Sequence, residues 1–516
     1  MVDDPLDEPK GPPVALNRRS WLAGAGASLT ALALMPPSAA RSQELGAQEL
    51  GAQKLGVDGF RLLHARPGMA PLRGPHALPT PIWGYDGVSP GPTLRVKQGE
   101  ELKIRLVNDL RQPTVIHWHG IRLPNAMDGV PHLTQMPVEP GASFDYRFTP
   151  PDAGTFWYHS HFLSSEQMAR GLAGVLIVEE RDPVAVDRDV ALVVNDWRLT
   201  NDGAVHPSFG NMHDAMMAGR LGQYITLNSQ DTLNLNVKSN ERIRLRIINT
   251  ANARSFEFRI PEHVTRIMAV DGQPCPPEIV PDGVLRLGPG TRVDLFLDLT
   301  LKPGASAPIL VDDLRGGWLE LGRVVYDSGA PRRAEPLPEP KALPANPLPH
   351  NLDLASALKV DVPLEGGGMG MMMGRGGMMG GGMRGGMGGG MGGGMGGAGF
   401  GGHGLPPQER IWALAGIASS GHDGPPIFKV ERGRTVVLDF TNRSALPHAM
   451  HVHGHHFRNL IGDGESHKPY WLDTVIVDPE RTERIAFVAD NPGKWMIHCH
   501  MIEHMATGMA AWFEVT

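Results

Sequence analysis

The sequence predicts an all-β protein made of three β-sandwich domains. Three observations support this prediction: short segments alternate apolar and charged residues, one pattern of glycine, asparagine and histidine is repeated, and helical periodicity is rare. The chain has 516 residues, which also suggests about three domains at ~150 residues each.

The alternation is clearest in residues 94–97, 102–106 and 243–247, with a looser form at 435–440. Successive side chains of a strand point to opposite faces, so this pattern predicts half-buried antiparallel strands. Glycine, proline and asparagine separate the segments and predict turns. Many short strands bounded by turns are typical of β-sandwiches.

The internal repeat connects the strands to the histidines. Gly99, Asn108 and His117 follow one another at intervals of nine residues. The same offsets lead to His451 in a second copy and to Phe258 in a third. The middle copy therefore carries apolar residues where the outer copies carry histidine, and we expect its domain to bind no metal ion. The second half of the pattern also has three copies: Gly154 with His159 and His161, Gly493 with His498 and His500, and Gly290 with Leu295 and Leu297.

The C-terminal residues carry the most specific motif, His498-Cys499-His500 followed by His504 and Met509. Two imidazoles, a thiolate and a weak axial thioether are the ligands of a mononuclear copper site that transfers electrons. Because side chains alternate along a strand, Cys499 can face one metal site while His498 and His500 face a second. Three further His-x-His pairs complete the pattern: His117 and His119, His159 and His161, His451 and His453.

The first repeat cannot build a second mononuclear site. At the four positions that correspond to His448, Cys499, His504 and Met509 it has Thr, Ser, Ser and Arg, the serine opposite Cys499 being Ser160. We therefore expect four copper ions, of which three share eight histidines. The fourth is expected on His448, Cys499, His504 and Met509.

The N-terminus resembles an export signal. Arg18 and Arg19 precede a weakly apolar run and the small residues that end at Ala40, the pattern of a twin-arginine signal peptide over residues 1–40. The apolar run of about 13 residues is too short to span a membrane. We expect a periplasmic protein, with residues 41–56 as a linker.

Composition excludes several classes of partner. The net charge is −7 and there is no basic run, which argues against nucleic acid as a partner, and no other stretch could span a membrane. Only Cys275 and Cys499 are present, so a disulfide framework is not expected. We expect a monomer.

Residues 366–402 contain 23 Gly and 10 Met. Such a glycine content disfavours a helix, and thioethers favour Cu(I), so the segment is interpreted as a flexible carrier of Cu(I) or, alternatively, as a plain linker. A shorter group, Met212, His213, Asp214, Met216 and Met217, is a second soft-metal candidate or an ordinary loop. The methionines expected to bind substrate Cu(I) are Met369, Met371, Met372, Met373, Met378, Met379, Met383, Met387, Met391 and Met395.

The His-x-His pairs, the C-terminal motif and the three repeats together resemble the multicopper oxidases, from about residue 57 to the C-terminus. The signal and the methionine-rich insertion resemble the periplasmic copper-efflux oxidases among them. The resemblance implies three cupredoxin-like Greek-key domains, here 57–182, 187–330 and 405–516, with a linker at 331–365. It also implies that dioxygen is reduced to water at the expense of Cu(I).

The resemblance assigns each ligand a role. His448, Cys499, His504 and Met509 would hold type 1 copper, and His117 with His451 type 2 copper. One type 3 copper would lie on His119, His159 and His500, and the other on His161, His453 and His498. Asp128 and Glu503 are candidate proton donors, with Cys499 as the electron path. Asp128 could also be a turn residue before Gly129.

Two positions depart from the copper-efflux pattern. Met505 stands where an acid is usual after the last type 1 histidine, and Ser444 and Leu446 replace an Asp and a Met of the substrate Cu(I) site. A laccase-like oxidase of phenols and aromatic amines, or a copper-sequestering protein, is therefore an alternative to a cuprous oxidase.

Overall fold

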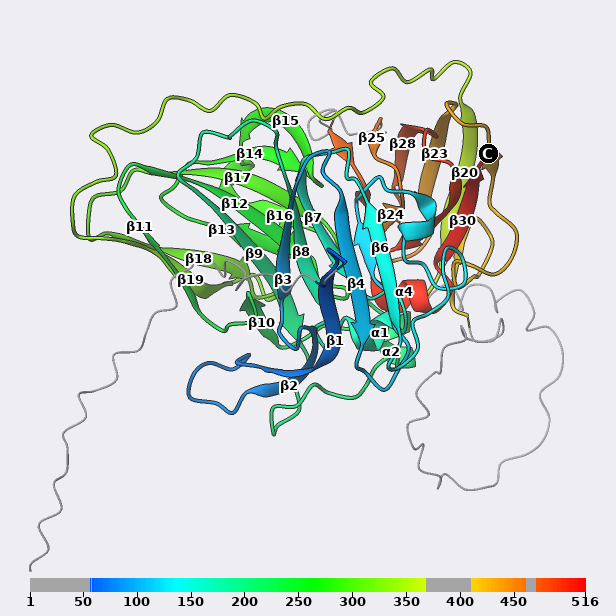
Figure 1. The fold of residues 1–516 in the computed structure, drawn as a ribbon, viewed down its shortest axis with the longest axis horizontal. Helices are drawn as coiled ribbons and strands as arrows, with labels where there is room; N and C mark the ends of the chain where they lie inside the picture. The colour runs from blue at the N-terminus through cyan, green and yellow to red at the C-terminus, as the bar shows by residue number, and fades with distance from the viewer. Residues whose placement is uncertain (1–55, 57, 368–409, 461–469) are drawn as a thin grey trace, which may run out of the picture. The chain divides into compact units, whose positions relative to one another are not determined.

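The computed structural model describes residues 56, 58–367, 410–460 and 470–516, and its strands form six sheets in three pairs (Figure 1). The predicted signal and most of the linker at 41–56 lie outside these residues, as do all ten candidate substrate methionines. Most strand pairs are antiparallel, which confirms the predicted all-β sandwich architecture.

The first pair of sheets covers residues 61–179. One sheet has the order β2-β1-β4-β6, and the other has the order β3-β8-β7-β5. In β4, Leu102, Ile104 and Leu106 are buried while Lys103 and Arg105 are not, as the alternation predicts. The strands are β1 (Arg61–Ala70), β2 (Thr80–Tyr85), β3 (Gly91–Lys97), β4 (Leu102–Asn108), β5 (His117–His119), β6 (Ser143–Phe148), β7 (Gly154–His159) and β8 (Ala173–Glu179).

The second pair has sheet orders β10-β9-β12-β17-β14-β15 and β11-β19-β18-β13-β16 around its own apolar core. Its strands are β9 (Arg188–Trp197), β10 (Tyr224–Leu227), β11 (Leu233–Val237), β12 (Glu241–Asn249), β13 (Phe256–Arg259), β14 (Thr265–Val270), β15 (Gln273–Ile279), β16 (Leu285–Leu287), β17 (Arg292–Leu299), β18 (Ser306–Asp312) and β19 (Trp318–Tyr326).

The third pair has sheet orders β21-β20-β23-β28-β25-β26 and β22-β30-β29-β24-β27. Its strands are β20 (Leu358–Gly366), β21 (Trp412–Leu414), β22 (Lys429–Val430), β23 (Thr435–Asn442), β24 (His448–Val452), β25 (Phe457–Asn459), β26 (Trp471–Leu472), β27 (Thr474–Val477), β28 (Thr482–Val488), β29 (Gly493–Cys499) and β30 (Ala510–Val515). Because β20 pairs with β23, the predicted linker 331–365 ends too late. Alternation of Leu358, Val360 and Val362 with Lys359 and Asp361 accounts for this strand.

The strand pairing repeats between the three units. The parallel pair β1–β4 recurs as β9–β12 and as β20–β23, and β5, β13 and β24 take equivalent positions. The second half of the repeat is misaligned in the middle unit. Leu295 and Leu297 lie in β17, which corresponds to β6 and β28, whereas the counterpart of β7 and β29 is β18.

The charged face of β12 is buried and does not face solvent. Arg244 and Arg246 are both only 1% exposed, because they form ion pairs with Asp294 at 2.6 and 3.2 Å. Arg246 also donates to Thr155 Oγ1 of β7, so this face closes an interface between the first and middle units.

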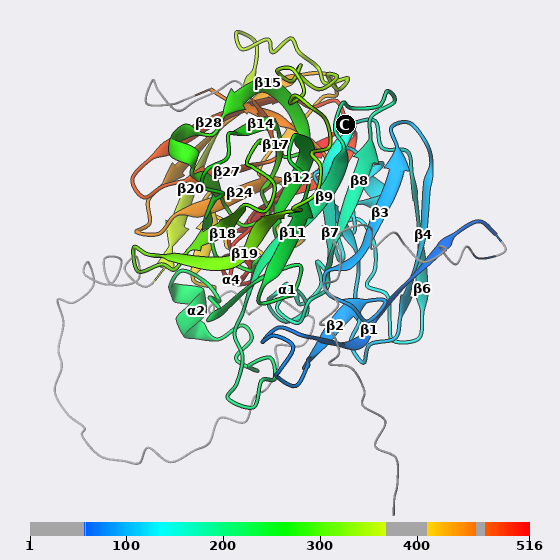
Figure 2. The same ribbon diagram turned by 90° about the vertical axis from the view of Figure 1, so that its left-hand side faces the viewer.

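Short helices lie near the third unit. They are α1 (Ser164–Gln167), α2 (Met212–Met216) and α4 (Ile502–Ala506), and single 3-10 turns are η1 (Asn125–Met127) and η2 (Pro281–Gly283). Both α1 and α2 contact α4, and Figures 1 and 2 show the three helices close together. No helix of the described ranges has the length and apolar character needed to cross a membrane.

Candidate metal centres

The first unit places its histidines on adjacent strands. β5 and β7 pair antiparallel, with His117 opposite His159. His119 lies at the end of β5, and His161 follows β7 by two residues. All four rings are buried, the most exposed being His161 at 7%.

The third unit repeats this arrangement. β24 and β29 pair antiparallel, with His451 opposite His498 and Met450 opposite Cys499. His453, His498 and His500 have no exposed surface. Both units therefore present a set of four buried imidazoles from the same two strand positions.

The two sets of imidazoles meet ring to ring. The rings of His117 and His453 stack at 3.9 Å between centroids, and those of His119 and His451 stack at 3.7 Å. His498 Nε2 lies 3.1 Å from His453 Nε2 and 3.5 Å from His161 Nε2. His159 and His500 complete the cluster with ring centroids 5.4 Å apart. All eight predicted histidines thus lie in one cluster, the histidine cluster.

The free ring nitrogens of this cluster fit metal ions. His117 donates Nδ1–H to the carbonyl of Asp128 (2.7 Å), and His451 donates Nδ1–H to the carbonyl of Asp473 (2.8 Å). Each Nε2 is then left buried with no hydrogen-bond partner, as are His119 Nδ1 and His159 Nε2. Unpaired buried nitrogens are costly, and a bound cation accounts for them.

Protonation of these rings is disfavoured. Burial, together with the charge of neighbouring imidazoles, holds the pKa of His159, His161 and His500 well below the ordinary value. Neutral imidazole is the form that binds metals. The cluster is therefore poised to take up cations rather than protons.

A second group lies on the other face of β29. Cys499 Sγ is 3.6 Å from His448 Nδ1 and 3.8 Å from His504 Nδ1, and the two nitrogens are 3.2 Å apart. We call this group, with Met509, the mononuclear site. His448 Nε2 is 2.8 Å from Ser444 Oγ, and His504 donates Nε2–H to the Met217 carbonyl at 2.7 Å. The outward nitrogen of each ring is thus occupied and the inward one faces Cys499.

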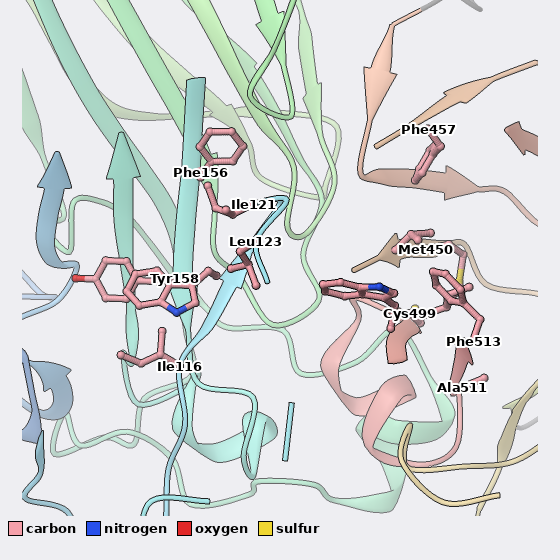
Figure 3. Close-up of a cluster of buried hydrophobic side chains, with 14 of the residues drawn as sticks. Ile116, Ile121, Leu123, Phe156, Tyr158, Met450, Phe457, Cys499, Ala511 and Phe513 are labelled. Carbon is pink, nitrogen blue, oxygen red and sulfur yellow. The ribbon is translucent and has the colours of Figure 1, made fainter. Parts of the chain in front are cut away.

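Apolar residues surround Cys499 and isolate it from water. Figure 3 shows it beside Met450 and near Phe513 in the core of the third unit. Burial raises the pKa of the Cys499 thiol to about 12, so a cation is needed to hold the thiolate near neutral pH. Met509 is fully buried, and its carbonyl accepts the Cys499 amide at 3.0 Å. Two imidazoles, a thiol and a thioether fit copper.

Two carboxylates support the histidine cluster, one of them predicted. Asp128 Oδ2 accepts Nδ1–H of His453 at 2.9 Å, joining the first unit to a histidine of the third. Asp473 was missed by sequence reasoning; its Oδ1 lies 3.2 Å from His119 Nε2. The tripeptides Asp128-Gly129-Val130 and Asp473-Thr474-Val475 share an Asp-x-Val pattern that could have revealed it.

Arg292 of the middle unit binds Asp473. Its Nη2 lies 2.6 Å from Asp473 Oδ2, and its Nη1 lies 3.5 Å from Asp271 Oδ1. Burial raises the pKa of Asp473, but Arg292 and His119 outweigh it and hold that pKa well below the usual range. Sequence reasoning missed this contribution of the middle unit.

Glu503 and Met505 lie in α4. Glu503 is buried and accepts hydrogen bonds from the Arg220 amide (2.9 Å) and Asn252 Nδ2 (3.3 Å), both of the middle unit. Burial raises its pKa. Within the described residues, no hydrogen bond or ion pair joins it to the histidine cluster. Met505 packs in an apolar cluster with Trp157, so the position of the expected acid is apolar.

Comparisons with known proteins agree with this geometry. Three multicopper oxidase family models match residues 71–183, 189–305 and 407–516. A multicopper oxidase structure from Pseudomonas thermotolerans is 33% identical, with a TM-score of 0.74 over 89% of this chain and 99% of that one. The chain belongs to the multicopper oxidase family.

Curated relatives of this oxidase come from different kingdoms. Multicopper oxidase MmcO of Mycobacterium tuberculosis is 27% identical over 83% of this chain and 81% of its own length. Laccase-13 of Arabidopsis thaliana is 27% identical over 83% of this chain and 88% of its own length. Family membership implies four coppers, of types 1, 2 and 3, and the two clusters provide donors for them.

Proposed function

We propose that this multicopper oxidase is exported and oxidises Cu(I) to Cu(II), passing the electrons to dioxygen, in copper tolerance. The observation that carries the proposal is the placement of Cys499. Its side chain belongs to the mononuclear site, while its chain neighbours His498 and His500 belong to the histidine cluster. One short stretch of β29 thus connects the place where electrons enter to the place where they are used.

Copper, when bound, supplies the one-electron redox chemistry and the reduction of dioxygen to water. The protein residues position it and exclude water. His117 with His451 would hold the type 2 ion, and the six other histidines the type 3 pair, since buried ring nitrogens of the cluster lack hydrogen-bond partners and several lie within 4.8 Å of one another. Asp128 fixes the ring of His453 and holds a carboxylate next to the cluster, where protons are consumed.

The methionines of the glycine-rich segment support Cu(I) as the substrate. Ten methionines lie in residues 366–402, and thioethers bind Cu(I) without competing protons. The mononuclear site itself is closed, since His448, His504 and Met509 are all 0% exposed. A buried site favours a small reductant over a bulky one.

A laccase-like oxidase is the second candidate. Ser444 binds His448 where the copper-efflux oxidases have an aspartate, and Leu446 packs against the core. These residues provide no ligand for substrate Cu(I). A phenol or aromatic amine would then be the reductant.

Dioxygen uptake separates these candidates. The mature, copper-loaded protein is given either Cu(I) or a methoxyphenol, and each reductant is tested with and without residues 369–402. The deletion begins after Gly366 because this residue of β20 pairs with Trp412 of β21. A variant with the ten methionines replaced by leucine is the matched control for the deletion. Fast uptake with Cu(I), slowed by both changes, supports the proposal. Good phenol oxidation with slow Cu(I) oxidation in every variant favours the laccase, and no turnover of either favours copper sequestration.

Export is proposed from Arg18 and Arg19. Replacing both by lysine should block twin-arginine export while leaving the fold intact. Cell fractionation of the wild-type and Arg18→Lys/Arg19→Lys chains measures this. Equal periplasmic yield of both chains would contradict the proposed route.

A further inference from the structure

Residues 211–217, here named the α2 segment, are bound to the mononuclear site by main-chain groups. His504 donates Nε2–H to the Met217 carbonyl at 2.7 Å. Trp412 donates its indole N–H to the Ala215 carbonyl at 2.7 Å, and its ring centroid lies 4.3 Å from that of His504. The middle unit therefore covers the outward edge of His504.

The α2 segment is held in a defined conformation. The Asn211 side chain caps the helix by accepting the Asp214 amide at 2.9 Å. Arg198 binds both carboxylate oxygens of Asp214, at 2.6 and 3.0 Å. Asp214 and Ala215 are buried and Met216 packs against the apolar core, whereas Met212, His213 and Met217 are exposed.

The three exposed side chains of the segment are donors that suit soft metal ions. Met212 is 43% exposed and Met217 is 49% exposed, and His213 between them is exposed as well. Met212 and His213 lie in the first turn of α2, and Met217 follows the last residue of the helix in an extended conformation, so the three donors lie within one short stretch of chain. Two thioethers and one imidazole form a neutral donor set that suits Cu(I) and is poor for hard cations.

The hydrogen bond to Met217 also disfavours an organic reductant at His504. The outward N–H of His504, at Nε2, is already donated to the Met217 carbonyl, and Nδ1 faces Cys499, so neither ring nitrogen is open to the hydroxyl of a phenol. The hydrogen bond from His504 to the Met217 carbonyl provides a bonded route between this surface residue and the mononuclear site. Met217 therefore offers both a thioether at the surface and a carbonyl that is hydrogen-bonded to His504.

We propose that Met212, His213 and Met217 bind the substrate Cu(I) and that Met217 passes its electron to His504. This inference rests on the proposed cuprous oxidase function. Each Cu(I) loses one electron and leaves as Cu(II). Four such oxidations, with four protons from solvent, reduce one dioxygen to two waters. The α2 segment takes the role that Ser444 and Leu446 cannot fill.

Kinetics with single and combined variants test this site. Met212→Leu, His213→Gln and Met217→Leu remove donors but keep side-chain size and the Met217 carbonyl. In the triple variant we expect the KM for Cu(I) to rise about tenfold, with a smaller change in kcat, as ligand loss weakens binding. Blue absorption and copper content verify that the mononuclear site is intact. Met69→Leu, at a methionine of β1 that is 54% exposed, is the matched control and should change neither constant.

A binding measurement keeps this inference separate from the proposed function. Silver(I), which has the same soft-ligand preference without the redox chemistry, is titrated into the reduced, anaerobic holoenzyme carrying methyl-labelled methionine. The single leucine variants identify the Met212 and Met217 methyl signals. Both signals should shift on addition of silver(I). An unchanged KM in the triple variant, or unshifted signals, would overturn the site. If wild-type protein fails to oxidise Cu(I) while the signals shift, the proposed function fails and the binding site stands.

Discussion

Asp128 and Asp473 occupy equivalent positions on opposite sides of the histidine cluster. Each gives its main-chain carbonyl to the first histidine of its own unit, at 2.7 Å for His117 and 2.8 Å for His451. Each also directs its carboxylate to a histidine of the other unit, at 2.9 Å for His453 and 3.2 Å for His119. The pair therefore fixes ring orientation across the domain boundary.

Asp128→Asn should slow turnover with dioxygen about 10- to 100-fold, because partners of ligand histidines orient the rings. Reduction of the mononuclear site should be unaffected, since the Asp128 carboxylate lies beside His453 and His117 of the histidine cluster. Steady-state oxygen uptake measures the first effect, and anaerobic bleaching of the blue colour the second. Asp145→Asn, at an exposed ion pair with Arg105, is the control. Equal loss in both measurements would contradict this role.

Arg292→Gln should destabilise the protein by about 3–5 kcal/mol, because it leaves the buried carboxylate of Asp473 without its cation. Arg484→Gln removes an exposed pair with Asp439 and should cost about 1 kcal/mol or less. Denaturant unfolding compares the two. The Arg292→Gln protein should also lose copper from the histidine cluster while keeping it in the mononuclear site. The type 2 electron paramagnetic resonance signal per chain, compared with that of wild type, measures this loss. A full signal would show that Arg292 only stabilises the fold.

Cys499→Ser should abolish the blue colour and the turnover of every reductant, because serine does not supply a thiolate. The histidine cluster should still bind its metal, giving about three coppers per chain in place of four. Cys275→Ser, in the core of the middle unit, should keep all four. Metal analysis and absorption spectra provide the numbers. Retained blue colour in Cys499→Ser would disprove the assignment.

Gly290→Ala should disturb the cluster sterically. Gly290 has φ +86°, and an added Cβ would lie 3.0 Å from the His500 ring and 3.2 Å from the His119 ring. Gly304 has φ +79° with nothing within 4 Å, so Gly304→Ala is a control for backbone strain alone. Both variants should lose about 1 kcal/mol of stability, but only Gly290→Ala should lose type 3 copper. Identical copper content would contradict the close approach.

We expect the free energy of unfolding to depend on pH because the pKa of the buried Asp271 is raised. Burial, with the charge of Asp473, raises its pKa to about 7, against the opposing effect of Arg292. The folded state therefore holds a proton that the unfolded chain releases near pH 4, so this contribution is present below pH 4 and is lost as pH rises to about 7. The unfolding free energy of Asp271→Asn should fall less than that of wild type between pH 5 and 7.5. Parallel curves would contradict the shift.

Much of the site could be predicted from sequence because its ligands lie on strands with fixed spacing. In the His-x-His pairs and in the motif around Cys499, side chains alternate between the two faces of a strand, so the spacing predicts which residues share a face. The roles of Asp473 and Arg292 were not predicted, because their partners are far away in the sequence and no local spacing of residues indicates the contact.

The fold class was predictable for the same reason, but register in the middle unit was not. Gly290 to Leu297 fits the repeat by residue type, yet β17 takes a different place in the sheet. The burial of the β12 arginines was not predicted either. Alternation identifies the two faces of a strand but does not tell whether the charged face meets water or, as with Arg244, another domain.

The most direct test of the central claim is the number of Cu(I) ions oxidised per dioxygen consumed by the mature holoenzyme, with hydrogen peroxide assayed in the same sample. A four-electron reduction that draws on the mononuclear site predicts four Cu(I) per dioxygen and no peroxide, with no turnover in Cys499→Ser. Two Cu(I) per dioxygen with peroxide released, or equal turnover in Cys499→Ser, would contradict it.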